Sequence, residues 1–195
     1  SFASRHGVEA GLVTAVDLVR GLGVLTDMTE VEVEGATGWY DTNYEGKRDA
    51  ALQTLADGAD LFIIHVEASD EAGHAGDIEE KIRALENWDR RILADLVTGL
   101  DSMGPWRLLL LPDHAPPIAT RTHSSDPVPY LLVDSEHDGP GGVYTERAVA
   151  DAVVGQAGVR PRLEALAPYG LAPESPSEAT LERLLPPLVA RAAEN

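Results

Sequence analysis

The clearest structural signal in this chain is the apolar run Leu61-Phe62-Ile63-Ile64-His65-Val66, which leads into Asp70-Glu71-Ala72-Gly73-His74. A short apolar run bounded by polar residues is typical of a central strand in a parallel sheet. The polar stretch therefore begins just past the end of a buried strand, where open α/β sheets place their ligands.

A second stretch has the same arrangement. The run Leu108-Leu109-Leu110-Leu111 precedes Pro112-Asp113-His114, and His123 follows in a polar segment over 121–127. Carboxylates and imidazoles at two strand ends are a ligand set for divalent ions. The two stretches together predict a pair of divalent ions that act on phosphate.

The rest of the chain alternates between strand and helix patterns. We expect strands at 11–15, 31–33, 107–111 and 130–133, and helices at 16–22, 45–56, after the N-cap Asp77, from 145 and near 181–189. The helix at 16–22 is expected to end at Gly21 and Gly23, and a turn is expected at 138–142. This order predicts one α/β domain over 1–195, with a mainly parallel sheet flanked by helices.

Composition narrows the class of protein. The formal net charge of −18 disfavours binding to nucleic acid, because the phosphate backbone would be repelled. No apolar run reaches the length of a membrane span. The chain has no cysteine, which excludes disulfides, thiolate metal sites and a cysteine nucleophile. We expect a cytoplasmic enzyme. Because the chain begins at Ser1, we also expect a processed product or a fragment.

The local geometry of the ligands is left open by the sequence. Asp70 and His74 would share a face in a helix, or converge in a loop through Gly73. Asp113 and His114 point in opposite directions in an extended segment, so they bind one ion only if the backbone turns, and otherwise could face two ions. We expect His123 to lie in a loop over the same sheet edge.

Three segments together resemble a known family. Residues 65–74 (HVEASDEAGH), 111–114 (LPDH) and 121–129 (RTHSSDPVP) closely resemble the archaeal type of cofactor-independent phosphoglycerate mutases, of the alkaline phosphatase-like superfamily. Residues 35–44 (GATGWYDTNY) and 15–21 (AVDLVRG) are also similar to that family. The resemblance runs from about residue 7 to residue 150, and the tail over 160–195 has no clear counterpart.

The resemblance implies an alkaline phosphatase-like metal-binding core and a specific ligand assignment. Asp70, His74 and His123 would hold one divalent ion, and Asp113 and His114 the other. The ions would be manganese or magnesium, with zinc as a further option. The implied activity is that of a glycolytic isomerase that interconverts 3-phosphoglycerate and 2-phosphoglycerate through a phosphoserine.

The chain departs from the family pattern in two ways. The family's serine nucleophile and its first aspartate ligand lie upstream of the matched region, and nothing here corresponds to them. The serines beside the metal motifs, Ser69, Ser124 and Ser125, do not receive that role from the resemblance. We therefore expect an incomplete core from the C-terminal half of a longer protein. Arg20 also stands where family members tend to carry lysine.

Several readings of function remain open. Related sequences include homoserine kinase-like proteins and phosphatases, so phosphotransfer or hydrolysis on another small substrate is one alternative. A second alternative is a non-catalytic half of a longer protein, which binds metal without turnover. We expect a small phosphorylated metabolite as ligand, and Arg20, Lys47 and Arg121 as candidate residues for binding it. Candidate partners are the missing N-terminal half or a second copy of the chain, and no membrane is expected.

Overall fold

The computed structural model describes residues 5–126, 128–137 and 144. The chain divides into two compact units, the first with residues 1–104 and 116–122 and the second with residues 105–115 and 123–195. The single α/β domain that the sequence predicts over 1–195 stays a prediction. The expected turn at 138–142, the helices from 145 and near 181–189, and the tail over 160–195 lie outside the described residues.

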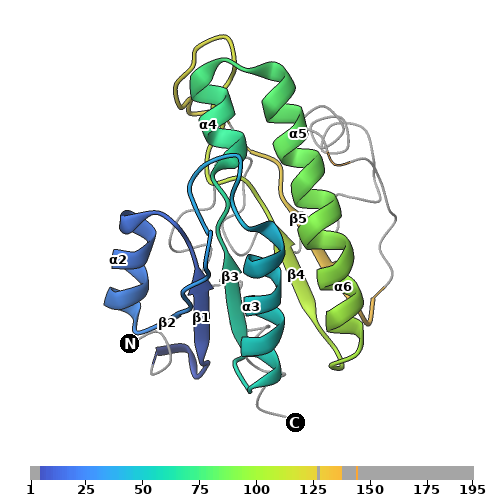
Figure 1. The fold of residues 1–195 in the computed structure, drawn as a ribbon. Helices are drawn as coiled ribbons and strands as arrows, with labels where there is room; N and C mark the ends of the chain where they lie inside the picture. The colour runs from blue at the N-terminus through green and yellow to red at the C-terminus, as the bar shows by residue number, and fades with distance from the viewer. Residues whose placement is uncertain (1–4, 127, 138–143, 145–195) are drawn as a thin grey trace. The chain divides into compact units, whose positions relative to one another are not determined.

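The sheet of the first unit is parallel, as the sequence predicts. Its strands are β1 (Ala10–Val13), β2 (Thr29–Glu30) and β3 (Leu61–Ile64), in the order β2-β1-β3 (Figure 1). The register of β1 and β3 runs from Ala10 opposite Leu61 to Val13 opposite Ile64. Both strands therefore end at the same edge, just before Thr14 and His65.

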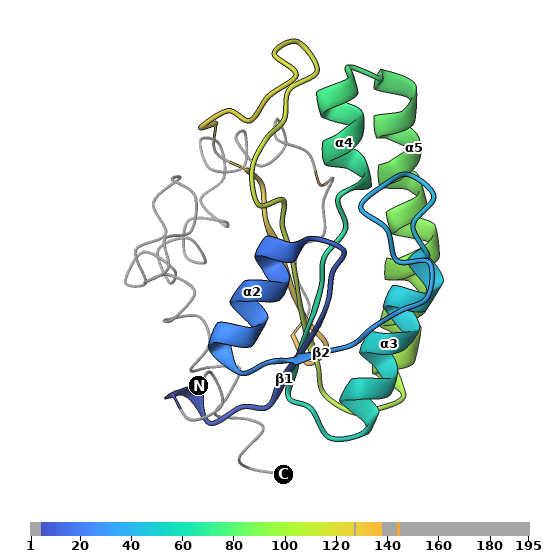
Figure 2. The same cartoon turned by 60° about the vertical axis from the view of Figure 1, so that its left-hand side comes forward.

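Helices cover both faces of this sheet. Helix α2 (Asp17–Thr26) lies on one face and α3 (Tyr44–Ala56) on the other (Figure 2). A Cβ added at Gly23 would lie 2.3 Å from Cδ2 of Leu12, so α2 approaches β1 through a residue without a side chain. The predicted α/β architecture with a parallel sheet is confirmed.

A long helical segment packs on α3. It consists of α5 (Ile78–Trp88), the π-helical turn η1 (Asp89–Leu93) and α6 (Ala94–Asp101). Asp77 caps its start by accepting a hydrogen bond from the Glu80 amide at 2.9 Å, as predicted. Nε and Nη2 of Arg91, in η1, each donate to the Glu45 carboxylate of α3 at 2.6 Å.

Three details of the first unit differ from the sequence-based expectations. Helix α2 continues through Gly21 and Gly23 to Thr26, because an interior glycine costs a helix only about 1 kcal/mol. The strand expected at 31–33 is instead the two-residue β2, at Thr29–Glu30. The spacing of Ile78, Ile82, Leu85, Trp88, Ile92 and Leu96 predicts one apolar stripe along the long helix. That stripe is buried at Ile92 and Leu96 but exposed at Ile78, Ile82 and Leu85.

The second unit contains an antiparallel pair. Strand β4 (Arg107–Leu110) pairs with β5 (Leu131–Asp134), with Arg107 opposite Asp134. Nε of Arg107 donates to Oδ2 of Asp134 at 2.6 Å and holds that register. Both strands lie close to their predicted positions, but the pairing is not parallel. A parallel pair requires a crossover, which the sequence pattern alone does not distinguish from a returning loop.

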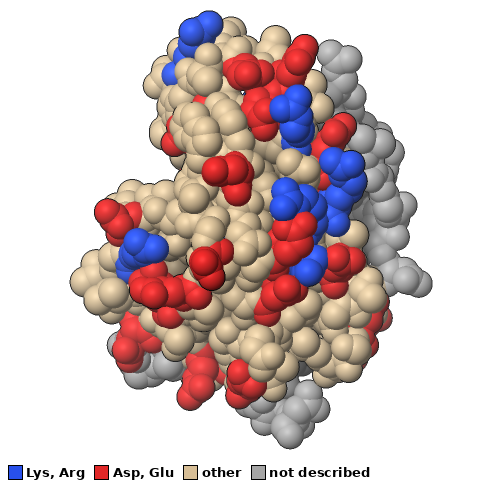
Figure 3. Space-filling view, viewed as in Figure 1, with Lys and Arg blue, Asp and Glu red and all other residues tan. Residues whose placement is uncertain are grey.

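Acidic side chains are scattered over the face shown in Figure 3, and the basic side chains over α5 and η1 are interleaved with acidic ones. Among the described residues, no helix combines the length and the apolar character that crossing a bilayer would require.

Candidate metal centre

The first group of candidate ligands lies on α4 (Ala68–Ala75), which follows β3 after three residues. Asp70 and His74 are one turn apart, so the helical alternative for this pair is the correct one. Oδ2 of Asp70 lies 3.3 Å from Nε2 of His74, and both side chains are partly buried. The helix ends at Gly76, whose φ of 73° is a left-handed conformation that glycine adopts without strain.

A backbone carbonyl fixes the orientation of the His74 ring. Nδ1 of His74 lies 3.0 Å from the carbonyl oxygen of Arg121. Because a carbonyl oxygen can only accept a hydrogen bond, Nδ1 must carry a hydrogen and donate it. A metal-binding histidine typically donates its second ring N–H to a carbonyl or carboxylate in this way.

This arrangement has a direct electrostatic consequence. In a neutral ring with its hydrogen on Nδ1, Nε2 presents a lone pair, and it faces a carboxylate oxygen of Asp70 at 3.3 Å. Two acceptors at that distance repel each other unless a cation lies between or beside them, either a proton on Nε2 or a metal ion. The Asp70–His74 pair therefore fits a divalent ion, since carboxylate oxygen and imidazole nitrogen are both metal ligands.

Two glycines allow the segment over 116–122 to lie against α4. A Cβ added at Gly73 would lie 2.9 Å from the carbonyl oxygen of Pro116, and one added at Gly76 would lie 2.5 Å from Nε of Arg121. Nζ of Lys81 also donates to the Pro116 carbonyl at 2.9 Å. Close packing of backbone on α4 is what brings the Arg121 carbonyl to His74.

The second unit holds the other candidate ligands. The backbone bends at Asp113 and His114, so that Oδ2 of Asp113 lies 3.1 Å from Nε2 of His114. Oδ1 of Asp113 also accepts a hydrogen bond from the His114 amide at 2.9 Å. The two side chains thus converge, which is the turned arrangement that binding to one ion requires.

His123 lies in a loop, as the sequence predicts, and its ring packs on the ring of His114. The ring centroids are 3.6 Å apart with the planes inclined by 32°. A bridge between Ala115 and Ser124 holds the two chain segments side by side.

The three candidate substrate-binding residues lie in the first unit. Arg20 pairs with Glu30 and lies 3.4 Å from Asp17, and hydrogen bonding to Glu30 raises its pKa above the usual value. Lys47 is completely buried, which lowers the pKa of its ammonium group. Arg121 is exposed and has a φ of 53°. Their predicted contacts with substrate stay predictions.

The structure therefore contains two ligand groups, one in each unit. Asp70 and His74 converge in the first, while Asp113, His114 and His123 converge in the second. Sequence reasoning passed over a further set of polar side chains in the first unit, formed by Thr14, His65 and Glu67. One sequence signal could have identified it: His65 and Glu67 are two residues apart, which places both on one side of an extended segment.

Known proteins resemble this chain over most of its length. The sequence model of the metalloenzyme superfamily matches residues 1–157. A 2,3-bisphosphoglycerate-independent phosphoglycerate mutase of Methanothrix thermoacetophila is 49% identical over 135 residues, which are 69% of this chain and 34% of that protein. A protein of the same name from Methanosarcina acetivorans is 39% identical over 158 residues, which are 80% of this chain and 40% of that protein.

A solved structure also shares the fold. A protein of Pyrococcus horikoshii aligns with a TM-score of 0.61 and 31% identity, over 69% of this chain and 40% of that protein. The chain thus spans between a third and two fifths of the length of the relatives it matches. The part that the superfamily model matches, residues 1–157, contains both ligand groups.

Proposed function

This chain belongs to the metalloenzyme superfamily, and on that premise we propose that it forms the metal-binding part of a 2,3-bisphosphoglycerate-independent phosphoglycerate mutase. The proposed reaction interconverts 3-phosphoglycerate and 2-phosphoglycerate through a phosphoserine. The names of the relatives support this activity.

The observation that carries the proposal is the Asp70–His74 pair. The Arg121 carbonyl commits Nδ1 of His74 to donating a hydrogen bond, and the other ring nitrogen, Nε2, faces Oδ2 of Asp70 at 3.3 Å. A surface Asp–His pair does not need a carbonyl to orient its ring. The orientation is the kind that raises the metal affinity of a histidine.

The resemblance of residues 121–129 to the mutase family implies that His123 joins the same ion. We assign Asp70, His74 and His123 to one divalent ion.

Asp113 and His114 are assigned to the second ion. The convergence of the Asp113 and His114 side chains supports their binding to one ion rather than to two.

Divalent ions bound there would neutralise phosphate oxygens and polarise the attacking hydroxyl. The serine nucleophile is not assigned to this chain. We propose that a further part of the same protein, or a co-purifying chain, supplies it. Manganese is the proposed ion, with magnesium as the alternative, and a cytoplasmic location stays a prediction.

The test is manganese binding by calorimetry, together with a mutase assay on 3-phosphoglycerate. The chain alone is expected to bind manganese but to give no turnover, and the complete protein is expected to give turnover that a chelator abolishes. A complete protein that binds manganese but releases inorganic phosphate, or phosphorylates another hydroxyl, would contradict the mutase assignment. Absence of manganese binding would contradict the metal centre itself.

A further inference from the structure

The two edges of the sheet in the first unit differ in character. In the order β2-β1-β3, strand β1 is central, and β2 and β3 each pair with β1 alone among the described strands (Figure 1). A strand that stays at the edge of a sheet is usually protected by short length, charged residues or proline, because its unpaired N–H and C=O groups otherwise attract another strand. Only one of the two edges has that protection.

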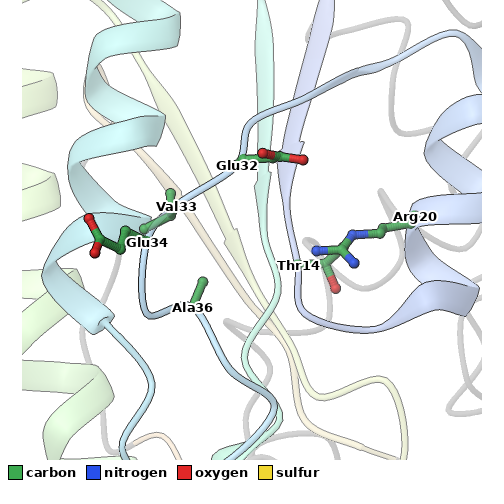
Figure 4. Close-up of a pocket in the computed structure, with 6 residues that line it drawn as sticks. All are labelled: Thr14, Arg20, Glu32, Val33, Glu34 and Ala36. Carbon is green, nitrogen blue, oxygen red and sulfur yellow. The ribbon is translucent and has the colours of Figure 1, made fainter.

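The β2 edge is short and charged. Strand β2 has two residues, Thr29 and Glu30, and Glu30 forms an ion pair with Arg20 of α2. The segment that follows contains two more carboxylates and borders a pocket of about 390 Å³. The residues that line this pocket are Thr14, Arg20, Glu32, Val33, Glu34 and Ala36 (Figure 4). Charged side chains therefore surround the β2 edge, which makes it suited to remain open to solvent.

The β3 edge has none of these features. Strand β3 consists of four apolar residues, Leu61–Ile64, and has no charged residue and no proline. The sequence predicts a central strand here, because a continuous apolar run is suited to burial on both faces of a parallel sheet. In the described part of the chain, however, β3 pairs only with β1. A strand with the sequence of a central strand thus lies at an edge.

Backbone hydrogen bonds show which groups of β3 lie at its open edge. The amide of His65 donates to the Val13 carbonyl oxygen at 3.0 Å, and the amide of Leu61 donates toward the same neighbouring segment. Successive residues of a strand direct their N–H and C=O groups to opposite sides. The amides of Phe62 and Ile64 therefore point away from β1, toward a side on which the described residues provide no strand.

Side-chain burial also indicates a further neighbour of β3. Leu12 of β1 and Ile63 of β3 are opposite each other in the parallel register, so their side chains lie on the same face of the sheet. Leu12, which has a strand on each side, has an exposed fraction of 1%. Ile63, which has a described strand on one side only, has an exposed fraction of 39%. An apolar strand beside β3 would flank Ile63 in the way that β3 flanks β1.

We propose that the open edge of β3 receives an apolar strand, parallel to β3, from a further part of the same protein. This choice of occupant rests on the proposed function, in which a further part supplies the serine. The chain spans 34% and 40% of the length of two relatives, so such proteins have ample sequence for another strand. The parallel direction matches the described strands of this sheet, and it would end the added strand at the edge where α4 carries Asp70 and His74.

The first test measures amide hydrogen exchange by NMR in this chain alone and in the complete protein. In the chain alone, the amides of Phe62 and Ile64 should exchange faster than those of Leu61 and His65. In the complete protein, exchange at Phe62 and Ile64 should slow by at least about tenfold more than at the other two. Equal slowing at all four amides overturns the proposal.

Protection of Phe62 and Ile64 in the chain alone also overturns the proposal. If that protection does not depend on protein concentration, another segment of this chain covers the edge. If it rises with concentration, in step with dimer formation in sedimentation velocity, a second copy of the chain covers the edge.

The second test compares Ile64→Pro with its matched control, Ile64→Ala. Both variants lose the isoleucine side chain, but only proline removes the N–H that faces the open edge. A strand tolerates proline where its N–H faces solvent, so the two variants of the chain alone should have similar urea midpoints. In the complete protein, Ile64→Pro should have the lower midpoint.

Equal midpoints in the complete protein overturn the proposal, as does a lower midpoint of Ile64→Pro in the chain alone. The proposed function fails separately. A complete protein that protects Phe62 and Ile64 but has no mutase turnover contradicts the mutase assignment and leaves the added strand in place.

Discussion

Nε2 of His74 faces Oδ2 of Asp70 at 3.3 Å, while Nδ1 of the same ring contacts the Arg121 carbonyl at 3.0 Å. The second contact makes the first unfavourable unless a cation is present. A divalent ion would supply that cation, since carboxylate oxygen and imidazole nitrogen are both metal ligands.

Removing a ligand from either group should weaken manganese binding. Asp70→Ala and His114→Ala are each expected to lower the affinity by at least about tenfold, because each removes a side chain that binds an ion directly. Isothermal titration calorimetry on the purified chain measures the effect. The control is Glu79→Gln, which changes an exposed carboxylate on α5. Unchanged affinity in both ligand variants would refute the two-ion assignment.

The close packing on α4 gives a second prediction. Gly73→Ala would place a methyl group 2.9 Å from the Pro116 carbonyl oxygen, so the segment that brings Arg121 to His74 must shift. We expect the free energy of unfolding to fall by about 1–3 kcal/mol and manganese affinity to fall with it. Urea unfolding and calorimetry measure the two effects.

Gly21→Ala is the matched control for this substitution. It introduces the same methyl group into α2, where nothing lies within 4 Å, and should raise stability by up to about 1 kcal/mol. If Gly73→Ala and Gly21→Ala change the free energy of unfolding and the manganese affinity in the same way, helix propensity explains both results. The contact between Gly73 and Pro116 would then not contribute to metal binding.

The sequence predicted the elements that carry the ligands better than the way they pair. The apolar run over 61–66 and the cap at Asp77 are local signals, and both appear as β3 and the start of α5. The antiparallel partner of β4 was missed because pairing direction depends on how the connection returns. Gly21 and Gly23 were misread as ends of a helix, since the contact of Gly23 with Leu12 is not local.

The candidate ligands could be named from sequence, but their supporting contacts could not. Asp70 and His74 stand out by residue type and spacing. The Arg121 carbonyl that orients His74 is a backbone atom 47 residues away, and every residue has one. The set formed by Thr14, His65 and Glu67 was missed for the same reason, because Thr14 and His65 are 51 residues apart.

A third prediction concerns the outer side of α2. Leu22 and Leu25 have exposed fractions of 53% and 81%, which is unusual for two large apolar residues on one helix. The double variant Leu22→Gln/Leu25→Gln should change the free energy of unfolding by no more than about 0.5 kcal/mol and reduce self-association. Urea unfolding and sedimentation velocity test this.

Leu12→Ala is the contrasting variant. Leu12 is 1% exposed and packs beneath α2, so its truncation should cost about 2–5 kcal/mol. A loss of about 2–5 kcal/mol of unfolding free energy in the Leu22→Gln/Leu25→Gln variant would contradict the prediction. It would show that these two side chains are buried, either against a partner chain or against another part of the protein.

A fourth prediction follows from the ion pair between α3 and η1. Hydrogen bonds from Arg91 lower the pKa of Glu45 below its usual 4.5, and the pair contributes about 1 kcal/mol or less because Glu45 is partly exposed. The unfolded chain binds a proton at Glu45 more readily than the folded chain does. The contribution is therefore complete above about pH 4.5 and is lost as the pH falls through the lowered pKa.

The measurement compares urea unfolding of the parent and of Glu45→Gln at a series of pH values. The parent should be the more stable protein at pH 7, and the difference should shrink toward zero as the pH falls below 4.5. Glu79→Gln, on the exposed side of α5, should show no such convergence. A difference between parent and Glu45→Gln that stays constant with pH would mean that shape complementarity, and not the charge of Glu45, holds α3 against η1.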